Sequence, residues 1–511
     1  MEARFEGLID SIRGRDRGYF QGRAMAAGII VVGLGPGDAQ QITREAWRVL
    51  EGADEVYLRT KHHPAVVGLP QGPIYRSFDE VYETAESFEA VYAEIVRRLL
   101  ALGRRPKGVI YAVPGHPLVG EATVHALRTR AQEEGLPLRL VAGLSFLEPT
   151  LAALGIDPFD GLQICDATLL GQRHHPNLDP DVGALIVQVY NRFVAAQAKA
   201  TLMNLYHDDH PVTLVCHAGT AEQRVCPLPL YELDRQEDLD HLTSAYLPPL
   251  DKPGSLASYQ DIVARLRAPG GCPWDREQTH QSLRTHLLEE TYEVLAALDA
   301  DDMAALEEEL GDLLLQVFLH AQIATEDGDF KLIDATQHVI EKLVRRHPHV
   351  FGETPVADAD EVLRNWEQIK RQEKGEEAFV SMLAGINKAL PALSQAMEMQ
   401  RRVARVGFDW PTAAPVIDKV REELDEFLAA PDAQRRSEEL GDVLFSLVNL
   451  ARWHEIDPES ALREANRRFA ERFARLERRA QESGQSLEEM PLAQMDALWE
   501  EAKRETAPED D

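Results

Sequence analysis

Hydrophobic positions divide the chain into two halves with different periodicities. From Gly28 to about Leu230, short β-branched runs such as Ile29 to Val32 alternate with amphipathic stretches such as Ile42 to Glu51. Such alternation predicts an α/β domain with a largely parallel sheet. Further strands are expected at 55–58, 108–113, 138–141, 184–190 and 212–216.

Beyond Tyr259 the strand signals fade, and apolar side chains recur with a helical period up to about Lys503, so this half is predicted to be all-helical. A Pro-rich, acidic stretch separates the two halves and is typical of a linker. The expected order is an N-terminal extension at 1–24, the α/β domain at 25–235, the linker at 236–258, two helical units at 259–380 and 381–503, and an acidic tail at 504–511.

The two helical units repeat one acidic pattern. The first contains Glu289-Glu290-x-x-Glu293 and then Glu309-x-x-Asp312, and the second contains Glu422-Glu423-x-x-Glu426 and then Glu439-x-x-Asp442. Carboxylates three apart share one face of a helix. In an antiparallel hairpin Glu290 lies level with Asp312 and Glu293 with Glu309, and the second pattern pairs in the same way. Each hairpin is therefore predicted to form a cluster of four carboxylates. The repeat suggests duplication.

Acids at this spacing most often form a solvated helix face. Three features favour a site instead. Glu309 and Asp312 flank an apolar stripe at 306–317, the register recurs in the second unit despite a shorter loop, and a glycine (Gly311, Gly441) precedes the Asp in both copies. Because glycine costs about 1 kcal/mol in a helix interior, we expect a close backbone approach at both glycines.

Clustered carboxylates repel one another unless cations neutralise them, and hard oxygen ligands suit Mg²⁺ or Mn²⁺ carrying a phosphate substrate. A ferritin-like di-iron bundle also uses helical carboxylates, but it needs Glu-x-x-His pairs, and neither acidic pattern contains one. Redox iron is therefore disfavoured.

Composition narrows the remaining classes. The length of 511 residues suggests roughly three or four domains, and 44% hydrophobic with 27% charged residues is ordinary for a globular protein. The net charge of -32 argues against a nucleic-acid partner. No apolar run approaches the roughly 18 residues of a membrane helix, so no membrane partner is expected. Four cysteines without C-x-x-C spacing fit a reducing cytoplasm.

The helical half resembles the MazG-type nucleoside triphosphate pyrophosphohydrolases. The resemblance rests on the two acidic patterns together with the segments Gly271–Asp275, Arg345–Phe351, Asn365–Glu367 and Gly407–Trp410. It implies all-α domains that assemble as dimers, acids that bind Mg²⁺, and attack of water on the α-phosphorus. Nucleoside triphosphate would thus become the monophosphate and diphosphate.

The resemblance also implies roles for single residues. The expected catalytic acids are Glu423, Glu426, Glu439 and Asp442. The expected metal ligands are these four with Glu422, Glu289, Glu290, Glu293, Glu309 and Asp312. The expected substrate-binding residues are Lys370, Lys419, Arg468, Arg472, Trp499 and Lys503. Because His286 and His338 occupy the first unit's places for Lys419 and Arg468, we expect the second unit to be the main catalyst.

The N-terminal half carries a Gly-rich turn, Gly33-Leu34-Gly35-Pro36-Gly37-Asp38, between a predicted strand and a helix. Such a turn permits close ligand approach, but this one breaks the dinucleotide pattern G-x-G-x-x-G, so NAD is not expected. The adjacent pair His62-His63 lies in a predicted loop, where histidines are usually solvated.

With Ile42-Thr43, Ala53–Val56, Ala112–Pro117 and Val141–Ser145, this turn resembles the tetrapyrrole (corrin/porphyrin) methylase family. The resemblance implies two α/β lobes with S-adenosylmethionine bound in the cleft between them. The expected cofactor-binding residues are Pro36, Gly37, Gly115, His116, Pro117, Ser145 and Val189. His116 stands where the family usually has Asp, which leaves methylation itself open.

The domain order resembles the YabN-type fusion proteins. The leading hypothesis is therefore a Mg²⁺-dependent nucleoside triphosphate pyrophosphohydrolase fused to an S-adenosylmethionine-binding domain. Two alternatives remain. The first is a methyltransferase whose helical half serves assembly or nucleotide sensing, and the second is a non-enzymatic nucleotide sensor.

Overall fold

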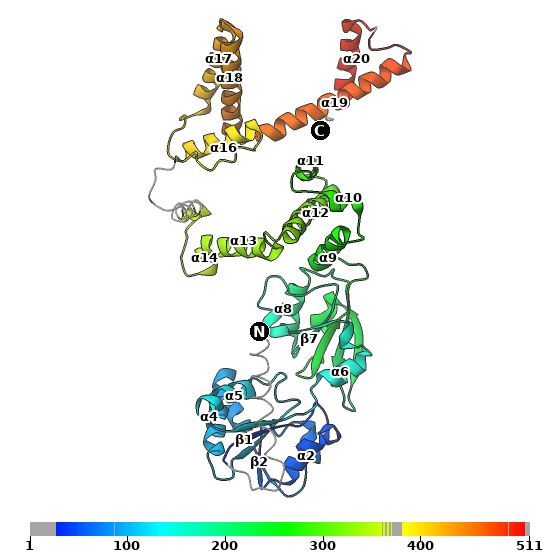
Figure 1. Ribbon diagram of the computed structural model, residues 1–511, viewed down its shortest axis with the longest axis vertical. Coiled ribbons are helices and arrows are strands. Elements are labelled where there is room, and N and C mark those ends of the chain that lie inside the picture. Colours follow the sequence, from blue (N-terminus) through cyan, green and yellow to red (C-terminus); the bar gives the residue numbers. More distant parts are fainter. Residues whose placement is uncertain are drawn as a thin grey trace. The chain divides into compact units, whose positions relative to one another are not determined.

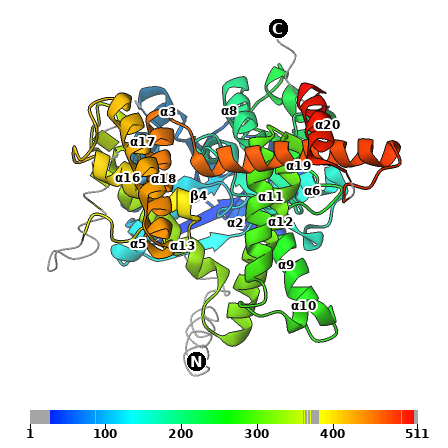
Figure 2. The same ribbon diagram turned by 90° about the horizontal axis from the view of Figure 1, so that it is seen from above.

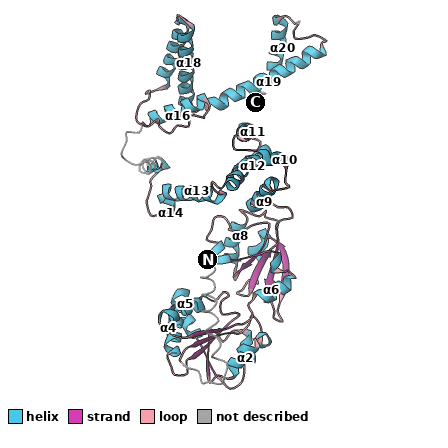
Figure 3. Cartoon of the chain, in the orientation of Figure 1, coloured by secondary structure: helices cyan, strands magenta, loops and turns pink. Residues whose placement is uncertain are grey.

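The computed structural model describes residues 27–505 apart from 86, 360, 363–364, 367–368, 370–380 and 489. The predicted extension at 1–24, Lys370 and the tail residues 506–511 lie outside the described residues. The chain divides into two compact units, and the boundary in the sequence falls between Ile262 and Val263. Strands occur only in the first unit of the described chain (Figure 3).

The first lobe contains a fully parallel five-stranded sheet. Its strands are β1 (Ile29–Gly33), β2 (Glu55–Leu58), β3 (Ile74–Ser77), β4 (Val109–Val113) and β5 (Leu138–Val141), in the order β3-β2-β4-β1-β5. Strand β1 therefore lies between β4 and β5. In such sheets ligands bind beyond the carboxyl ends of the strands where the order reverses, which here means after β1, β4 and β5.

Helices cover both faces of this sheet. Helices α4 (Phe88–Gly103) and α5 (Ala122–Glu133) lie on one face, and α2 (Arg44–Glu51) lies on the other (Figure 1). The β-branched strands are apolar on both sides, as sheets with two covered faces require. The 3₁₀ turns η1 (Ala39–Gln41) and η2 (Pro64–Gly68) and helix α3 (Asp79–Thr84) complete the lobe.

The second lobe has a mixed sheet in the order β6-β7-β10-β8-β9. Its strands are β6 (Leu162–Asp166), β7 (Gly183–Val187), β8 (Pro211–Cys216), β9 (Arg224–Pro229) and β10 (Thr243–Leu247). Helices α6 (Leu147–Leu154), α7 (Ala167–Leu170) and α8 (Arg192–Leu202) accompany them with the turns η3 (Pro158–Asp160) and η4 (Leu230–Arg235). The predicted α/β class of this half is confirmed.

The stretch expected to be a linker, 236–258, belongs largely to the second lobe. Its residues Thr243–Leu247 form β10, which pairs antiparallel with both β7 and β8. Backbone N–H groups of Gly254 and Ser255 then donate to the Asp181 carboxylate at 2.8 and 3.0 Å. The linker prediction is wrong because proline-rich flanks hide a short strand that is held by backbone pairing.

All the regular secondary structure described in the second unit is helical. Its helices are α10 (Pro273–Glu277), α11 (Arg284–Asp299), α12 (Met303–Asp327), α13 (Leu332–Arg346), α14 (Pro348–Phe351), α16 (Ala392–Ala404), α17 (Ala413–Ala429), α18 (Ala433–Trp453), α19 (Pro458–Glu482) and α20 (Leu492–Glu505). Helix α9 (Leu256–Arg267) spans the boundary between the units. Because α20 continues to Glu505, the predicted start of the tail at residue 504 is wrong.

The two acidic patterns fold as the expected helical hairpins. Helix α11 packs along α12, and α17 packs along α18 (Figure 2). Within the part of the chain that the structure describes, no helix has both the length and the apolar character of a bilayer-spanning segment.

Candidate functional sites

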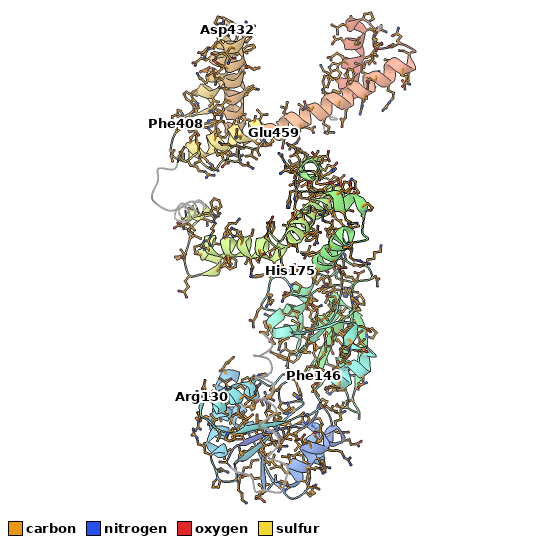
Figure 4. All side chains as sticks on the ribbon, viewed as in Figure 1. Arg130, Phe146, His175, Phe408, Asp432 and Glu459 are labelled. Carbon is orange, nitrogen blue, oxygen red and sulfur yellow. The ribbon has the colours of Figure 1, made fainter. Side chains whose placement is uncertain are left out.

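The second hairpin is built from α17 and α18 and a short turn. Asp432 at the tip of the hairpin (Figure 4) caps α18, because its carboxylate accepts a hydrogen bond from Arg435 N at 2.9 Å. Such a cap satisfies an otherwise unpaired amide of the first turn. The cap fixes the start of α18 and hence the faces on which its later acids lie.

Three acids of this hairpin converge. Glu423 from α17 and Glu439 and Asp442 from α18 each offer a carboxylate oxygen, and these oxygens lie within 4.8 Å of one another. Glu439 is only 2% exposed, and its Oε2 atom is buried without a hydrogen-bond partner among the described residues. Burial raises the pKa of Glu439, while Arg435 opposes the shift. An orphaned carboxylate oxygen in a cluster of acids fits a divalent cation.

Two cations touch this triad. Lys419 Nζ lies 2.8 Å from a carboxylate oxygen of both Glu422 and Glu423, and these contacts raise the pKa of Lys419. Arg435 contacts Glu439 at 2.5 Å. Arg435 is absent from the residues expected from the sequence, although its position one turn before Glu439 is the signal by which it could be found. Positive charge therefore already lies against the acids.

The first hairpin forms a different triad. Oxygens of Glu290, Glu293 and Glu309 lie within 4.8 Å of one another. Burial raises the pKa of Glu290, and Asp312 and Glu293 add to the shift. Burial likewise raises the pKa of Glu309, with Glu293 and Glu308 contributing. Burial and mutual repulsion thus disfavour the charged form of these carboxylates, and a divalent cation would relieve that repulsion.

Each hairpin brings together three of its four expected acids. Asp312 in the first hairpin and Glu426 in the second stand outside the triads, although both contribute to the charge around them. Glu426 lies on an open face of α17 with Asp418, Arg421, Glu422, Asp425 and Ala429. Glu289 contacts His286 at 3.1 Å and is also outside its triad.

The close approach expected at Gly311 and Gly441 is wrong for the single chain. A Cβ atom added at either glycine would meet no atom within 4 Å among the described residues. The apolar stripe beside the first triad is also not fully buried, since Leu310 and Val317 are each more than two-fifths exposed. Both helical faces therefore remain open to another surface.

The substrate-binding residues expected near the C-terminus lie on the last two helices. Helix α19 carries Arg468 and Arg472, and α20 carries Trp499 and Lys503. Arg468 contacts Glu464 at 3.0 Å, and Lys503 contacts Glu500 at 2.6 Å. The indole of Trp499 packs on Phe469, whose ring centroid is 5.0 Å away. Arg468 and Lys503 therefore each lie against an acid of their own helix, and the Phe469–Trp499 contact joins α19 to α20.

Glycine contacts shape the expected cofactor site of the first unit. A Cβ atom at Gly33, the end of β1, would stand 2.5 Å from Gly115 O. One at Gly143, after β5, would stand 2.3 Å from the same oxygen. Gly35 and Gly115 form an antiparallel bridge, and Thr43 Oγ1 donates to Ala142 O at 2.9 Å. The loops after β1, β4 and β5 therefore form one cradle that only glycine allows.

Other expected cofactor residues surround this cradle. Ser145 donates from its N–H and its hydroxyl to Glu148 Oε2 at 2.8 and 2.5 Å. His116 accepts a hydrogen bond from Leu118 N at Nδ1, at 3.1 Å. Pro36, Gly37, Pro117 and Val189 are buried in their loops. Val189 belongs to the second lobe, where its N–H donates to Thr243 O at 3.3 Å.

His63 differs from the expectation of a solvated loop histidine. Its ring is buried, and Nδ1 accepts a hydrogen bond from Ala65 N at 3.3 Å. Burial lowers the pKa of His63 to about 4, and the neighbouring His241 of the second lobe lowers it further. A neutral imidazole therefore lies where the two lobes meet.

Comparisons with known proteins match both halves of the chain. The family Tetrapyrrole (Corrin/Porphyrin) Methylases matches residues 28–234, and the MazG nucleotide pyrophosphohydrolase domain matches residues 278–351, which include the first acidic hairpin. A second MazG unit therefore stays a prediction.

Relatives match either nearly the whole chain or one half of it. The chain is 44% identical over 493 residues to the uncharacterised protein YabN of Bacillus subtilis (strain 168), covering 94% of this chain and 99% of YabN. It is 48% identical over 242 residues to the nucleoside triphosphate pyrophosphohydrolase/pyrophosphatase MazG of Thermotoga maritima, covering 47% of this chain and 93% of that protein. Among solved structures, uroporphyrin-III-C-methyltransferase from Thermus thermophilus is 21% identical, with a TM-score of 0.34, over 43% of this chain and 92% of that chain.

Proposed function

Because the chain belongs to the family of YabN-like proteins, which join a tetrapyrrole methylase domain to a MazG pyrophosphohydrolase region, we propose that it hydrolyses nucleoside triphosphates. The products are the nucleoside monophosphate and diphosphate. The observation that carries the proposal is the orphaned, buried Oε2 of Glu439 within a triad of acids that two cations already touch.

The acids would hold the metal of this reaction. Glu423, Glu439 and Asp442 would bind Mg²⁺ or Mn²⁺, with Glu426 adding negative charge nearby. When bound, such a cation lowers the pKa of a water molecule and neutralises the triphosphate, so that attack at the α-phosphorus becomes possible. The chain itself would supply the carboxylate ligands that hold the cation in one position.

Cationic side chains would hold the phosphates. Lys419 and Arg435 neutralise the triad in this structure, and a bound divalent cation would compete with them for the same carboxylates. Once displaced, both side chains are available to phosphate oxygens. Phosphoryl transfer depends mainly on such positioning and charge stabilisation. On α19 and α20, Arg468, Arg472, Trp499 and Lys503 are further candidates for substrate binding.

The second hairpin is the stronger candidate for the main catalyst. Its triad includes two buried acids and adjoins Lys419 and Arg435, whereas His286 and Ala305 occupy the corresponding positions of the first hairpin. The first triad keeps its acids and would still bind a cation. We therefore assign the first hairpin a weaker or differently selective activity.

Exposed apolar side chains support assembly as a homodimer through the helical half. On α17 and α18 the large apolar side chains exposed by at least two-fifths are Leu424, Leu428, Leu440, Leu444, Phe445 and Leu447. A stripe of this kind normally marks an interface. The open space at Gly311 and Gly441 is consistent with helices of a second copy lying against these hairpins.

The glycine cradle supports S-adenosylmethionine as the ligand of the first unit. Gly33, Gly115 and Gly143 let the loops after β1, β4 and β5 pack closely at the carboxyl edge of the sheet, which is where ligands bind in sheets of this kind.

Product analysis tests the proposed hydrolysis. Full-length protein is incubated with each nucleoside triphosphate and Mg²⁺, and the products are resolved. Nucleoside monophosphate plus inorganic diphosphate is the expected result. Nucleoside diphosphate plus inorganic phosphate, or binding without turnover, would contradict the proposal. The second alternative from the sequence, a sensor, predicts the latter.

Matched variants divide the activity between the hairpins. Glu423→Gln should reduce turnover by at least about 100-fold, because losing a ligand disorders the metal. Glu290→Gln should reduce it far less. Asp418→Asn is the control, because Asp418 is exposed on the same helix as Glu423 and contacts Arg421 rather than the triad. Loss of activity in Glu290→Gln with activity retained in Glu423→Gln would reverse the assignment.

A further inference from the structure

Gln41 ends the short turn η1 and reaches from the first lobe to the second. Its Nε2 donates a hydrogen bond to Gly219 O at 2.8 Å, across 178 positions of sequence. Because Gly219 presents a carbonyl oxygen, the amide must turn its NH₂ group toward the second lobe. The orientation of the side chain is thereby fixed, and Oε1 points the other way.

Two glycines make room for this side chain. A Cβ atom at Gly37 would stand 2.6 Å from Gln41 Oε1, and one at Gly219 would stand 2.8 Å from Gln41 Nε2. Gly219 also has a left-handed φ of 75°, which favours glycine. The amide is therefore wedged between a loop of the glycine cradle and a loop of the opposite lobe.

Oε1 of Gln41 is buried, yet it accepts no hydrogen bond from any residue that the structure describes. Buried amide oxygens nearly always have a partner, because leaving one unpaired sacrifices the hydrogen bond that water supplies in the unfolded chain. The missing donor must come from outside the described chain. The glycine beside Oε1 is Gly37, which belongs to the Gly-rich turn after β1, so the donor would enter beside that turn.

We propose that Gln41 is a cofactor-binding residue whose Oε1 accepts a hydrogen bond from S-adenosylmethionine while its Nε2 holds the second lobe in place. This inference rests on the proposed cofactor and extends it to a residue that the sequence did not indicate. S-adenosylmethionine carries suitable donors in its ammonium group, its adenine amine and its ribose hydroxyls. All three share the N–H or O–H chemistry that a neutral amide oxygen accepts.

The two hydrogen bonds of Gln41 would couple ligand binding to the contact between the two lobes. One amide contacts the second lobe through Nε2 and the ligand through Oε1, so ligand binding and lobe closure share a single side chain. Hydrogen bonds that are chained through one group polarise one another. The ligand is therefore expected to bind most tightly when the bond between Gln41 and Gly219 is intact.

Calorimetric titration of the full-length protein with S-adenosylhomocysteine tests the proposal. Gln41→Met keeps the length of the side chain and removes both polar atoms, and it should weaken binding by about 3- to 10-fold. Gln40→Met is the matched control, because Gln40 is the exposed neighbour in the same turn and should bind like the wild type. Thermal melting without ligand verifies folding, and Gln41→Ala replaces Gln41→Met if the latter does not fold.

A second titration distinguishes the donors. Methylthioadenosine lacks the ammonium group, so a loss confined to S-adenosylhomocysteine assigns the bond to that group. An equal loss for both ligands assigns it to the adenosine part, and either result supports the proposal. Binding of both ligands by Gln41→Met within twofold of the wild type overturns it and leaves Oε1 to an ordered water. Failure of the wild type to bind either ligand overturns the proposed cofactor as well.

Discussion

A buried ion pair lies beyond the carboxyl end of β2 in the first lobe. Arg59 follows β2, and its guanidinium contacts Glu121 at the start of α5, where the side chains are 18% and 3% exposed. Arg59 Nε also donates to Tyr82 OH at 2.9 Å, and the guanidinium lies 5.6 Å from the centroid of the Tyr92 ring. Replacing Glu121 by Leu leaves this guanidinium buried without its counter-charge.

The magnitude follows from that burial. Removing one partner of a buried pair costs about 3–5 kcal/mol, because the remaining charge is uncompensated, whereas replacing both partners by apolar groups is often neutral. For a domain of this size about 1 kcal/mol shifts the melting temperature by roughly 2–4 °C. Glu121→Leu should therefore lower the melting temperature of the first unit by roughly 6–20 °C. Arg59→Met with Glu121→Leu should recover most of this loss.

Differential scanning calorimetry of the full-length protein measures the shift. The control is Asp54→Asn, which removes an exposed pair with Lys107 at 2.7 Å in the same lobe and should leave the transition unmoved. A second readout is the affinity for S-adenosylhomocysteine, because Glu121 ends the loop that begins at Gly115. A shift for Glu121→Leu no larger than that of the control would contradict a buried, uncompensated charge, and so would a double variant as unstable as the two single losses combined.

The remaining predictions concern pH, assembly, the cradle and the metal. Burial lowers the pKa of His63 from 6.5 to about 4, so the unfolded chain binds more protons than the folded chain between these pH values. The free energy of unfolding should therefore fall as the pH drops from 6.5 to about 4. His63→Asn, which keeps a side-chain acceptor for the Ala65 amide, should reduce this fall in denaturation curves. Gly143→Ala places a Cβ 2.3 Å from Gly115 O and should abolish S-adenosylhomocysteine binding in calorimetry, which unchanged affinity would disprove. Leu428→Asp at a side chain 71% exposed should yield monomers in light scattering, and an unchanged mass would exclude this face. Mg²⁺ should raise the melting temperature of the wild type but not of Glu439→Gln, and an equal rise would remove Glu439 from the metal site.

Hydrophobic patterning predicts the buried strands well, because a run of β-branched residues such as Ile29 to Val32 is typical of a buried strand. The strands that it misses are short or polar. Residues Ile74–Ser77 form β3 at a sheet edge, and Arg224–Pro229 form β9 with two prolines, which only an edge strand tolerates. Pairing with neighbours, rather than local sequence, determines these strands.

The acidic sites show the same division. Helical spacing is enough to place Glu290, Glu309, Glu423 and Glu439 on facing sides of their hairpins. It does not determine which carboxylates meet, because side-chain rotamers and helix rotation select three acids from each set of four. Arg435 was not anticipated because a cation among neighbouring charges looks like any surface residue until its contact with Glu439 is known.

The place of β10 in its sheet has a consequence for synthesis of the chain. This strand is the last strand in the sequence of the first unit, but it lies between β7 and β8. Neither of those strands can complete its backbone pairing until β10 has been made. On the ribosome the second lobe would stay open until Leu247 has left the exit tunnel, when the first helices of the MazG half are already being made. Domains generally fold from the N-terminus as they emerge. Here the order of translation allows the hydrolase half to begin folding as soon as the methylase half has closed.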